Sequence, residues 1–255
     1  MKMLTITVSV TKVFVIFTAL TCPMLTFAAS KSIVLVHGLN MDGWVWQKVS
    51  HLLEAKNYHV TAVQMPQTSV HEDIAAVNRI IHAQSGPVVL VGHSYGGMVI
   101  SQTGTHPSVK ALVYIAAFQP EIGESLAELN AAFPAELPAN SLQFFKDGYY
   151  IVKPNAWIEN VADGLSLQES GYSSKFQTPA NTTIFTFKPL AAAWQSKPHW
   201  SAIALNDRTV SPKLQQFMSK RSHANTITIN SGHLLPLSHP KEVAQLIEMA
   251  AESIE

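Results

Sequence analysis

The sequence contains only one cysteine among its 255 residues. That residue, Cys22, lies in an N-terminal stretch that we predict to be removed. The remaining chain then has no thiol, which excludes disulfides, thiolate metal ligands and a cysteine nucleophile. Lipidation of Cys22 is a minor alternative, because the preceding residues 19–21 (Ala-Leu-Thr) fit the usual small-residue context poorly.

Charged residues are also scarce. They make up 13% of the chain, about half of the usual share of roughly 25%. Seventeen basic side chains balance seventeen acidic ones, and no basic stripe is visible. Electrostatic binding to nucleic acid is therefore not expected. Internal repeats and low-complexity tracts are absent as well, whereas apolar residues reach 47%, enough for a substantial core.

The N-terminus has the features of a secretory signal peptide. Lys2 supplies a positive charge, residues 13–20 are mostly apolar, and residues 26–30 offer small side chains for cleavage. Lys12 and Pro23 bound the apolar run, which is too short for a good membrane span. We predict a signal peptide over residues 1–29, cleavage near residues 28–30, and export to the bacterial periplasm or medium without a stable membrane span. An uncleaved N-terminal anchor is the alternative.

Beyond residue 30, strand-like and helix-like segments alternate. Four short runs rich in Val, Ile and Leu are typical of strands buried on both faces, and helical patterns separate them. The predicted strands are 33–36, 58–63, 88–91, 111–115, 200–205 and 226–229, and the predicted helices are 44–56, 72–84, 96–106, 212–221 and 240–253. This alternation predicts an α/β fold: a doubly wound, mostly parallel sheet with helices on both faces.

The alternation lapses between about residues 120 and 188. Scattered prolines, short helical stretches and many aromatic residues occupy this segment. We therefore predict one domain, residues 30–255, with a small helical cap inserted at about 120–188. The aromatic residues have two interpretations. They either shape a pocket for a small hydrophobic substrate or form a core within the cap, since pockets and cores share composition.

The sharpest local pattern is Gly92-His93-Ser94-Tyr95-Gly96, between a predicted strand and a predicted helix. This is the context that the nucleophile-elbow motif G-x-S-x-G requires. Ser94 is expected on a strained turn that exposes its hydroxyl, and the residues two before and two after it must be small because they come close together. A glycine-rich structural turn is the alternative interpretation.

A serine hydroxyl is a weak nucleophile and needs a base. His233 follows a predicted strand, at the edge of the sheet where Ser94 is also expected. Asp207 follows the preceding predicted strand, and the chain order Ser, Asp, His is the one that this type of fold uses. We therefore predict a catalytic triad of Ser94, Asp207 and His233. Two alternatives concern the acid: Asp207 caps the helix that begins near Pro212, or Asp163 of the insertion replaces it.

The loop after the first predicted strand, His37-Gly38-Leu39-Asn40, is the expected second part of an oxyanion hole. In this type of fold one amide comes from that loop and another from the residue after the nucleophile. We predict that the backbone N–H groups of Leu39 and Tyr95 hold the oxyanion. His37 is expected to be structural and to hydrogen-bond within the loop.

These motifs together resemble the α/β-hydrolase superfamily, and within it the branch of plant methyl-ester hydrolases and hydroxynitrile lyases. The resemblance runs along nearly the whole chain after the signal segment and is carried by the motifs above together with residues 42–46 (Asp-Gly-Trp-Val-Trp), 116–118 (Ala-Ala-Phe) and 123–125 (Gly-Glu-Ser). It implies a helical cap over an apolar pocket, no metal and no organic cofactor. The lyases carry a threonine and a lysine where Gly38 and Leu234 stand, so lyase chemistry is not expected.

The sequence thus predicts an esterase that cleaves a small hydrophobic carboxylic ester through an acyl-enzyme. The same residues suit lactones, including acyl-homoserine lactones, and a slow-turnover ligand receptor would retain the same fold and triad. Fold analogy does not decide between these functions, and aryl esters and amides also fit the pattern.

Overall fold

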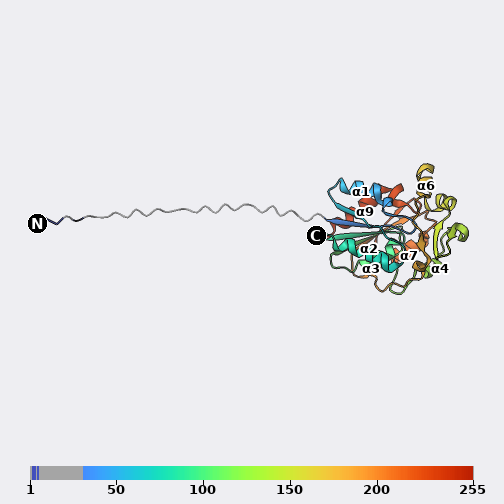
Figure 1. The fold of residues 1–255 in the computed structure, drawn as a ribbon, viewed down its shortest axis with the longest axis horizontal. Helices are drawn as coiled ribbons and strands as arrows, with labels where there is room; N and C mark the ends of the chain where they lie inside the picture. Colours follow the sequence, from blue (N-terminus) through green and yellow to red (C-terminus); the bar gives the residue numbers. More distant parts are fainter. Residues whose placement is uncertain (1, 4, 6–30, 255) are drawn as a thin grey trace.

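The computed structural model describes residues 2–3, 5 and 31–254 (Figure 1). The predicted signal peptide, its cleavage site and Cys22 lie outside the described residues, apart from three positions near the N-terminus. Within the described part of the chain, no helix is both long and apolar enough to cross a membrane.

A six-stranded parallel sheet forms the centre of the protein, in the order β2-β1-β3-β4-β8-β9. The strands are β1 (Ser32–Val36), β2 (His59–Ala62), β3 (Val88–His93), β4 (Val109–Ile115), β8 (His199–Ala204) and β9 (Asn225–Ile229). Each predicted strand is found within about two residues of its expected bounds. The prediction is most direct for β1 and β3, which are buried along their whole length and are apolar almost without interruption.

Helices cover both faces of the sheet (Figure 1). One layer contains α1 (Gln47–Glu54) and α9 (Pro240–Glu252), and the other contains α2 (Val70–His82), α3 (Gly96–Thr103) and α7 (Pro212–Ser222). Alternate residues of β1 point to opposite layers, because Ile33 and Leu35 join the first core cluster while Val34 and Val36 join the second. The predicted helix 44–56 is divided into a 3₁₀ turn, η1 (Gly43–Trp46), and α1. A short helix that was not predicted, α8 (Leu235–Ser238), precedes α9.

The chain between β4 and β8 leaves the sheet and builds a separate layer at one end of it (Figure 1). Besides short helices it contains a three-stranded antiparallel sheet, β5-β6-β7, which the sequence pattern does not predict. Its elements are α4 (Leu126–Ala132), η2 (Ala139–Ser141), β5 (Leu142–Phe144), β6 (Tyr149–Val152), α5 (Pro154–Ala156), η3 (Trp157–Val161), α6 (Leu167–Ser173), β7 (Ala180–Asn181), η4 (Thr182–Thr186) and η5 (Ala193–Gln195). We call residues 120–195 the cap.

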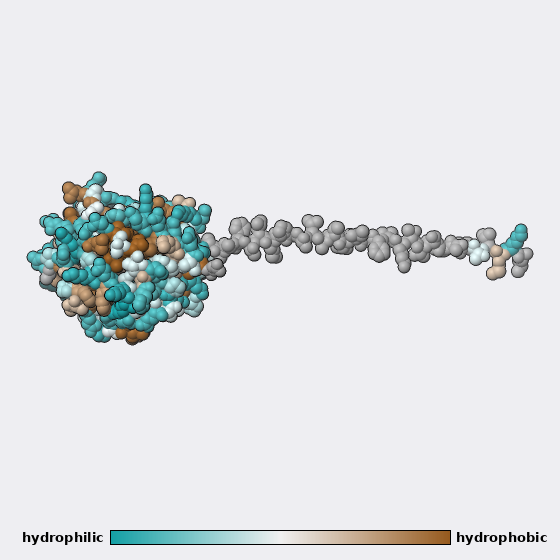
Figure 2. Space-filling view, turned by 180° about the vertical axis from the view of Figure 1, so that it is seen from behind, coloured by the Kyte–Doolittle hydropathy of each residue, from teal (hydrophilic) through white to brown (hydrophobic). Residues whose placement is uncertain are grey.

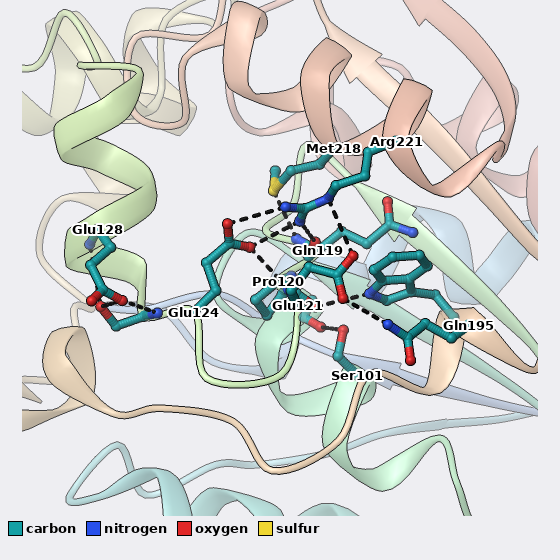
Figure 3. Close-up of polar contacts among 12 residues, drawn as sticks. Ser101, Gln119, Pro120, Glu121, Glu124, Glu128, Gln195, Met218 and Arg221 are labelled. Carbon is teal, nitrogen blue, oxygen red and sulfur yellow. Dashed lines mark hydrogen bonds and ion pairs between the residues drawn. The ribbon is translucent and has the colours of Figure 1, made fainter.

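The start of the cap is fixed to the end of α7 by one arginine (Figure 3). The Arg221 guanidinium donates to both carboxylate oxygens of Glu124, at 3.1 and 2.9 Å, and to the carbonyl of Gln119 at 3.0 Å. Glu121 lies 3.8 Å from the same guanidinium. These ion pairs hold the first turn of the cap where the chain leaves β4.

Most of the surface on the face shown in Figure 2 is hydrophilic, and the largest hydrophobic area lies near its middle. Large exposed apolar side chains are concentrated in the cap, where Leu167, Leu190, Tyr172 and Phe144 are 85%, 80%, 64% and 62% exposed.

Candidate active site

Ser94 occupies a sharp turn between β3 and α3. Its φ of +55° is in the left-handed region, which a non-glycine residue adopts only when its surroundings hold it there. A Cβ atom on Gly92 would lie 2.7 Å from the backbone of Gly96, so the two flanking glycines approach as closely as the sequence predicts. The Ser94 N–H donates to the carbonyl of Ile115 at the end of β4, at 3.2 Å, which anchors the turn to the neighbouring strand.

His233 and Asp207 meet after the last two strands of the sheet. The His233 Nδ1–H donates to Asp207 Oδ2 at 2.8 Å, and both residues are buried. This bond fixes the tautomer in which Nε2 is free to accept a proton. Ser94 and His233 line the same cavity. The structure therefore brings the three predicted residues to one end of the parallel sheet.

The Asp207 carboxylate accepts four hydrogen bonds. Its Oδ1 accepts from the backbone N–H groups of Thr209 (2.7 Å) and Val210 (2.9 Å), and Oδ2 accepts from Gln215 Nε2 (2.8 Å) as well as from His233. These donors fix the plane of the carboxylate. Asp207 does not cap α7, because the N-cap of that helix is Ser211. The capping alternative is therefore wrong.

Asp163, the alternative acid, lies in the cap beside the loop that carries His233. A Cβ atom on Gly232 would collide with the Asp163 carboxylate, 2.1 Å from Oδ1, so the two segments are in close contact. Burial raises the pKa of Asp163, and its Oδ1 accepts no hydrogen bond from the residues that the structure describes. The His233 Nδ1–H donates to Asp207 and not to Asp163.

Two backbone N–H groups remain for an oxyanion. Leu39 and Tyr95 both line the cavity, and neither N–H donates to another group within residues 31–254. His37 orients the first of them: its Nε2 accepts from the Met65 N–H at 3.0 Å, and its Nδ1–H donates to the carbonyl of Gly38 at 2.8 Å. Because a trans peptide places C=O and N–H on opposite sides, this bond turns the Leu39 N–H away from His37. His37 thus has the expected structural role, and burial lowers its pKa to about 4.

Gly38 brings this loop against the serine. A Cβ atom at position 38 would lie 2.7 Å from Ser94 Cβ and 3.2 Å from Ser94 Oγ. Any side chain here would displace either the loop or Ser94. In this chain the packing of the loop against Ser94 therefore requires glycine at position 38.

The cavity above Ser94 has a volume of about 310 Å³, which suits a small ligand. Apolar side chains dominate its lining, and no Asp, Glu, Lys or Arg is among the described residues that line it. Of the aromatic residues of the cap, Tyr150, Trp157 and Phe185 line the cavity, while Tyr172 and Phe176 are at least half exposed and their rings lie 4.4 Å apart. The aromatic residues are therefore divided between the pocket and the surface of the cap.

Residues 33–246 match the alpha/beta hydrolase family. The chain belongs to the alpha/beta hydrolase family. An alpha/beta hydrolase of the fungus Aspergillus novofumigatus is 30% identical over 254 residues, which covers 88% of this chain and 98% of that protein.

Other relatives of this alpha/beta hydrolase are esterases by name, over a shorter span. A carbendazim-hydrolysing esterase of Nocardioides is 35% identical over 44% of this chain and 52% of its own length. Polyneuridine aldehyde esterase of Rauvolfia serpentina is 30% identical over 44% of this chain and 49% of its own length. The match thus spans about half the length of these two relatives.

Solved structures share the fold. The crystal structure of polyneuridine aldehyde esterase superposes with a TM-score of 0.74 at 20% identity, over 86% of this chain and 98% of that one. The crystal structure of a variant of the pyrethroid hydrolase PytH superposes with a TM-score of 0.74 at 21% identity, over 88% of this chain and 98% of that one.

Two polar residues of this alpha/beta hydrolase contact the site although the sequence reasoning does not single them out. The His93 Nε2–H donates to the carbonyl of His233 at 3.0 Å, the two rings lie 4.6 Å apart, and burial holds the pKa of His93 well below its usual value. Gln215 of α7 bonds Asp207. In the sequence, His93 could be noticed as an imidazole inside the serine motif, and Gln215 as an amide within the predicted helix 212–221.

Proposed function

We propose that this chain is a serine hydrolase that cleaves small hydrophobic carboxylic esters through an acyl-enzyme. Ser94 is the nucleophile, His233 the general base and Asp207 the orienting acid, and the N–H groups of Leu39 and Tyr95 form the oxyanion hole. The observation that carries this proposal is that His233, which donates to Asp207 at 2.8 Å, lines the same cavity as Ser94 on its strained turn.

In the first half of the reaction, His233 Nε2 takes the proton of the Ser94 hydroxyl as Oγ attacks the ester carbonyl. Asp207 stabilises the resulting imidazolium through the Nδ1–H bond. The tetrahedral oxyanion accepts hydrogen bonds from Leu39 and Tyr95. The imidazolium then protonates the departing alcohol oxygen, and the C–O bond breaks to leave an ester on Ser94.

In the second half, a water molecule takes the place of the alcohol. His233 removes a proton from this water as its oxygen attacks the acyl carbonyl, and the same two amides hold the second oxyanion. His233 returns the proton to Ser94 Oγ as the acid product leaves. In each half, His233 gives back the proton that it takes up.

The cavity lining supports an uncharged, apolar substrate. A charged substrate would lose its hydration in this cavity without finding a partner of opposite charge among the lining residues that the structure describes. The esterase names of the relatives agree with ester cleavage. Lactones, which are cyclic esters, remain a second substrate class for the same chemistry.

The test is turnover of p-nitrophenyl acetate by Ser94→Ala. We expect a loss of about 10⁴-fold or more in kcat with an unchanged circular dichroism spectrum. Ser101→Ala is a matched control, because Ser101 is a buried serine of the adjoining helix α3 that does not line the cavity. Wild-type turnover by Ser94→Ala would refute the assignment.

Two further measurements define the function. A fluorophosphonate probe should label Ser94, and the absence of labelling would favour a ligand receptor over an enzyme. A panel of esters of increasing chain length, lactones and amides should give the largest kcat/KM for short apolar esters. Lactones as the best substrates would move the proposal to lactone hydrolysis.

We also propose that the protein is exported and that residues 1–29 are a cleaved signal peptide. The family match begins at residue 33 and β1 begins at Ser32, so cleavage near residues 28–30 would leave the fold intact. Mass spectrometry of the exported protein should show a new N-terminus at these positions. An intact Met1 would contradict cleavage.

A further inference from the structure

We propose that Asp73 and Gln67 are positioning residues of the oxyanion hole, which hold in place both backbone segments that supply its amides. This inference rests on the function proposed above and extends it to residues that do not touch the substrate. Neither residue lines the cavity, and both are fully buried.

Gln67 holds the loop of the first amide. Its Oε1 accepts from the N–H of Asn40 at 2.7 Å, and its Nε2 donates to the carbonyl of Met41 at 2.7 Å. Asn40 follows Leu39 directly, so the carboxamide fixes the peptide next to the proposed donor. The two backbone partners also settle the orientation of the amide, because one can only donate and the other can only accept.

Asp73 connects this loop to the second amide. Its Oδ1 accepts from the backbone N–H of Gln67 at 2.8 Å, and its Oδ2 accepts from the hydroxyl of Tyr95 at 2.7 Å. Tyr95 is the residue whose N–H is the second proposed donor, and its side chain is fully buried. The Asp73 carboxylate therefore links Gln67, which holds the loop of the Leu39 N–H, to the side chain of Tyr95, which supplies the other N–H.

The backbone along this path is strained. Asn40, Gln67 and Ser94 have φ values of 58°, 57° and 55°, and they account for three of the six non-glycine residues with positive φ among those the structure describes. Such conformations cost about 1–3 kcal/mol each and persist only where surrounding contacts enforce them. The hydrogen bonds of Gln67 and Asp73 are the contacts that enforce two of them.

The position of Asp73 is unusual for a carboxylate. It lies on the buried face of α2, between the apolar residues Val70 and Val77, and burial raises its pKa to about 6. A negative charge on this side of the site does not attract an oxyanion, so the residue has no direct electrostatic benefit for the transition state. Its contribution is the geometry that its two hydrogen bonds fix.

The same network reaches the cap through main-chain groups. Asn40 Nδ2 donates to the carbonyls of Tyr150 (3.0 Å) and Thr178 (3.3 Å), and the N–H of Asn181 donates to the carbonyl of Gln67 at 2.9 Å. Strands β6 and β7 of the cap are thus hydrogen-bonded to the two residues that shape the oxyanion loop.

The experiment compares Tyr95→Phe with Tyr114→Phe. Both tyrosines are buried and each donates or shares one side-chain hydrogen bond, but the Tyr114 hydroxyl pairs with Ser101 outside the cavity. With p-nitrophenyl acetate we expect kcat and kcat/KM of Tyr95→Phe to fall together by about 10-fold, and KM to change less than about twofold, because oxyanion contacts act in the transition state. Inhibition by phenylboronic acid, which forms a tetrahedral adduct with serine, should weaken in parallel.

Two variants of Asp73 complete the series. Asp73→Leu removes both acceptors and should lower kcat by about 100-fold, about the loss of one oxyanion donor. Asp73→Asn should recover most of this loss, because its Oδ1 can accept from Gln67 and its Nδ2 can donate to the Tyr95 oxygen. If Asp73→Leu does not fold, Tyr95→Phe carries the test alone.

The outcomes separate this inference from the proposed function. If Tyr95→Phe has the same kcat and the same affinity for phenylboronic acid as Tyr114→Phe, and Ser94→Ala is inactive, the positioning role is wrong. If Ser94→Ala keeps wild-type turnover, the proposed function itself fails. A fall in melting temperature that is equal in both tyrosine variants, with loss of kcat only in Tyr95→Phe, supports the inference.

Discussion

The two ends of helix α7 hold different parts of the protein by different means. Near its start, Gln215 is 4% exposed and bonds Asp207, the carbonyl of Val210 and the N–H of Ala204. Near its end, the Arg221 side chain is 20% exposed and pairs with glutamates of the cap (Figure 3). The buried end holds the proposed catalytic acid with bonds that water cannot replace. The more exposed end fixes the cap with ion pairs that water and salt weaken.

The largest effect should come from the buried end. Asp207→Asn is expected to lower kcat by about 10⁴-fold, because an amide cannot hold His233 in the required tautomer. The fold should survive, since the amide oxygen can still accept from the N–H groups of Thr209 and Val210. Turnover of p-nitrophenyl acetate and the melting temperature check both points.

Asp163→Asn is the matched control for that variant, because it makes the same chemical change on the cap side of the site. We expect its kcat to stay within about threefold of the wild type, since Asp163 makes no bond to the His233 ring. A greater loss in Asp163→Asn than in Asp207→Asn would reverse the choice of acid.

Acid should destabilise the protein through buried groups and not exposed ones. Burial lowers the pKa of His37 to about 4, and it holds the pKa of His93 well below its usual value. Their unfolded forms bind protons below about 6.5 and their folded forms do not, so stability falls as the pH drops from 6.5 toward 4. For His37 the loss between pH 7 and 4.5 is about 2 kcal/mol.

Asp73 opposes this trend. Its folded pKa of about 6 exceeds the ordinary value of 3.8, so the folded state gains stability as the pH falls through that range. Asp73→Asn should therefore increase the loss of unfolding free energy between pH 7 and 4.5 by about 2 kcal/mol, measured by urea unfolding at both pH values. Glu128→Gln is the control at an exposed carboxylate, whose pKa Lys188 lowers to about 2, and it should change the acid loss little. If Asp73→Asn and Glu128→Gln changed the acid loss of stability equally, the distinction between the buried and the exposed carboxylate would be wrong.

Gln215→Leu should have an intermediate effect. It leaves the N–H of Ala204 and the carbonyl of Val210 without partners in a buried region. We expect the free energy of unfolding to fall by about 2 kcal/mol and kcat by about 10-fold. Urea unfolding and turnover measure the two losses, and an unchanged kcat would show that Asp207 needs no support from α7.

The smallest effect should come from Arg221→Gln. The ion pairs that it removes are partly exposed, so the free energy of unfolding should fall by about 1 kcal/mol or less, and 0.5 M NaCl should shrink the difference from the wild type. kcat should stay within about twofold. If Arg221→Gln cost more than Gln215→Leu, the contrast between the two ends of α7 would be lost.

The sheet and its helices could be predicted from the sequence because burial leaves a continuous pattern. Residues such as 88–91 and 111–115 are apolar without interruption, and the structure extends these strands only to Val88–His93 and Val109–Ile115. The cap could not be predicted in this way. Strand β5 has three residues and β7 has two, too few for a periodic pattern, so their pairing depends on contacts with distant segments.

The site was predictable where its residues sit in local motifs, and not where they act through long-range bonds. Ser94 and His233 each follow a recognisable strand, and the structure places them at one cavity. The bond from Tyr95 to Asp73 spans 22 residues and that from Asn40 to Gln67 spans 27. The signal for Asp73 was a carboxylate on the apolar side of a predicted helix, which is informative only once the facing segment is known.

The contacts between the oxyanion loop and the cap have a consequence for evolution. Asn40 and Gln67 are hydrogen-bonded to main-chain groups of Tyr150, Thr178 and Asn181. The side chains of these three cap residues take no part in the bonds. Substitutions at these three cap residues can therefore change the choice of substrate while these hydrogen bonds to the oxyanion loop are kept. The β5–β6 hairpin contributes Leu142, Tyr150 and Val152 to the cavity, so a change of substrate needs only substitutions there, with the residues around Ser94 left as they are.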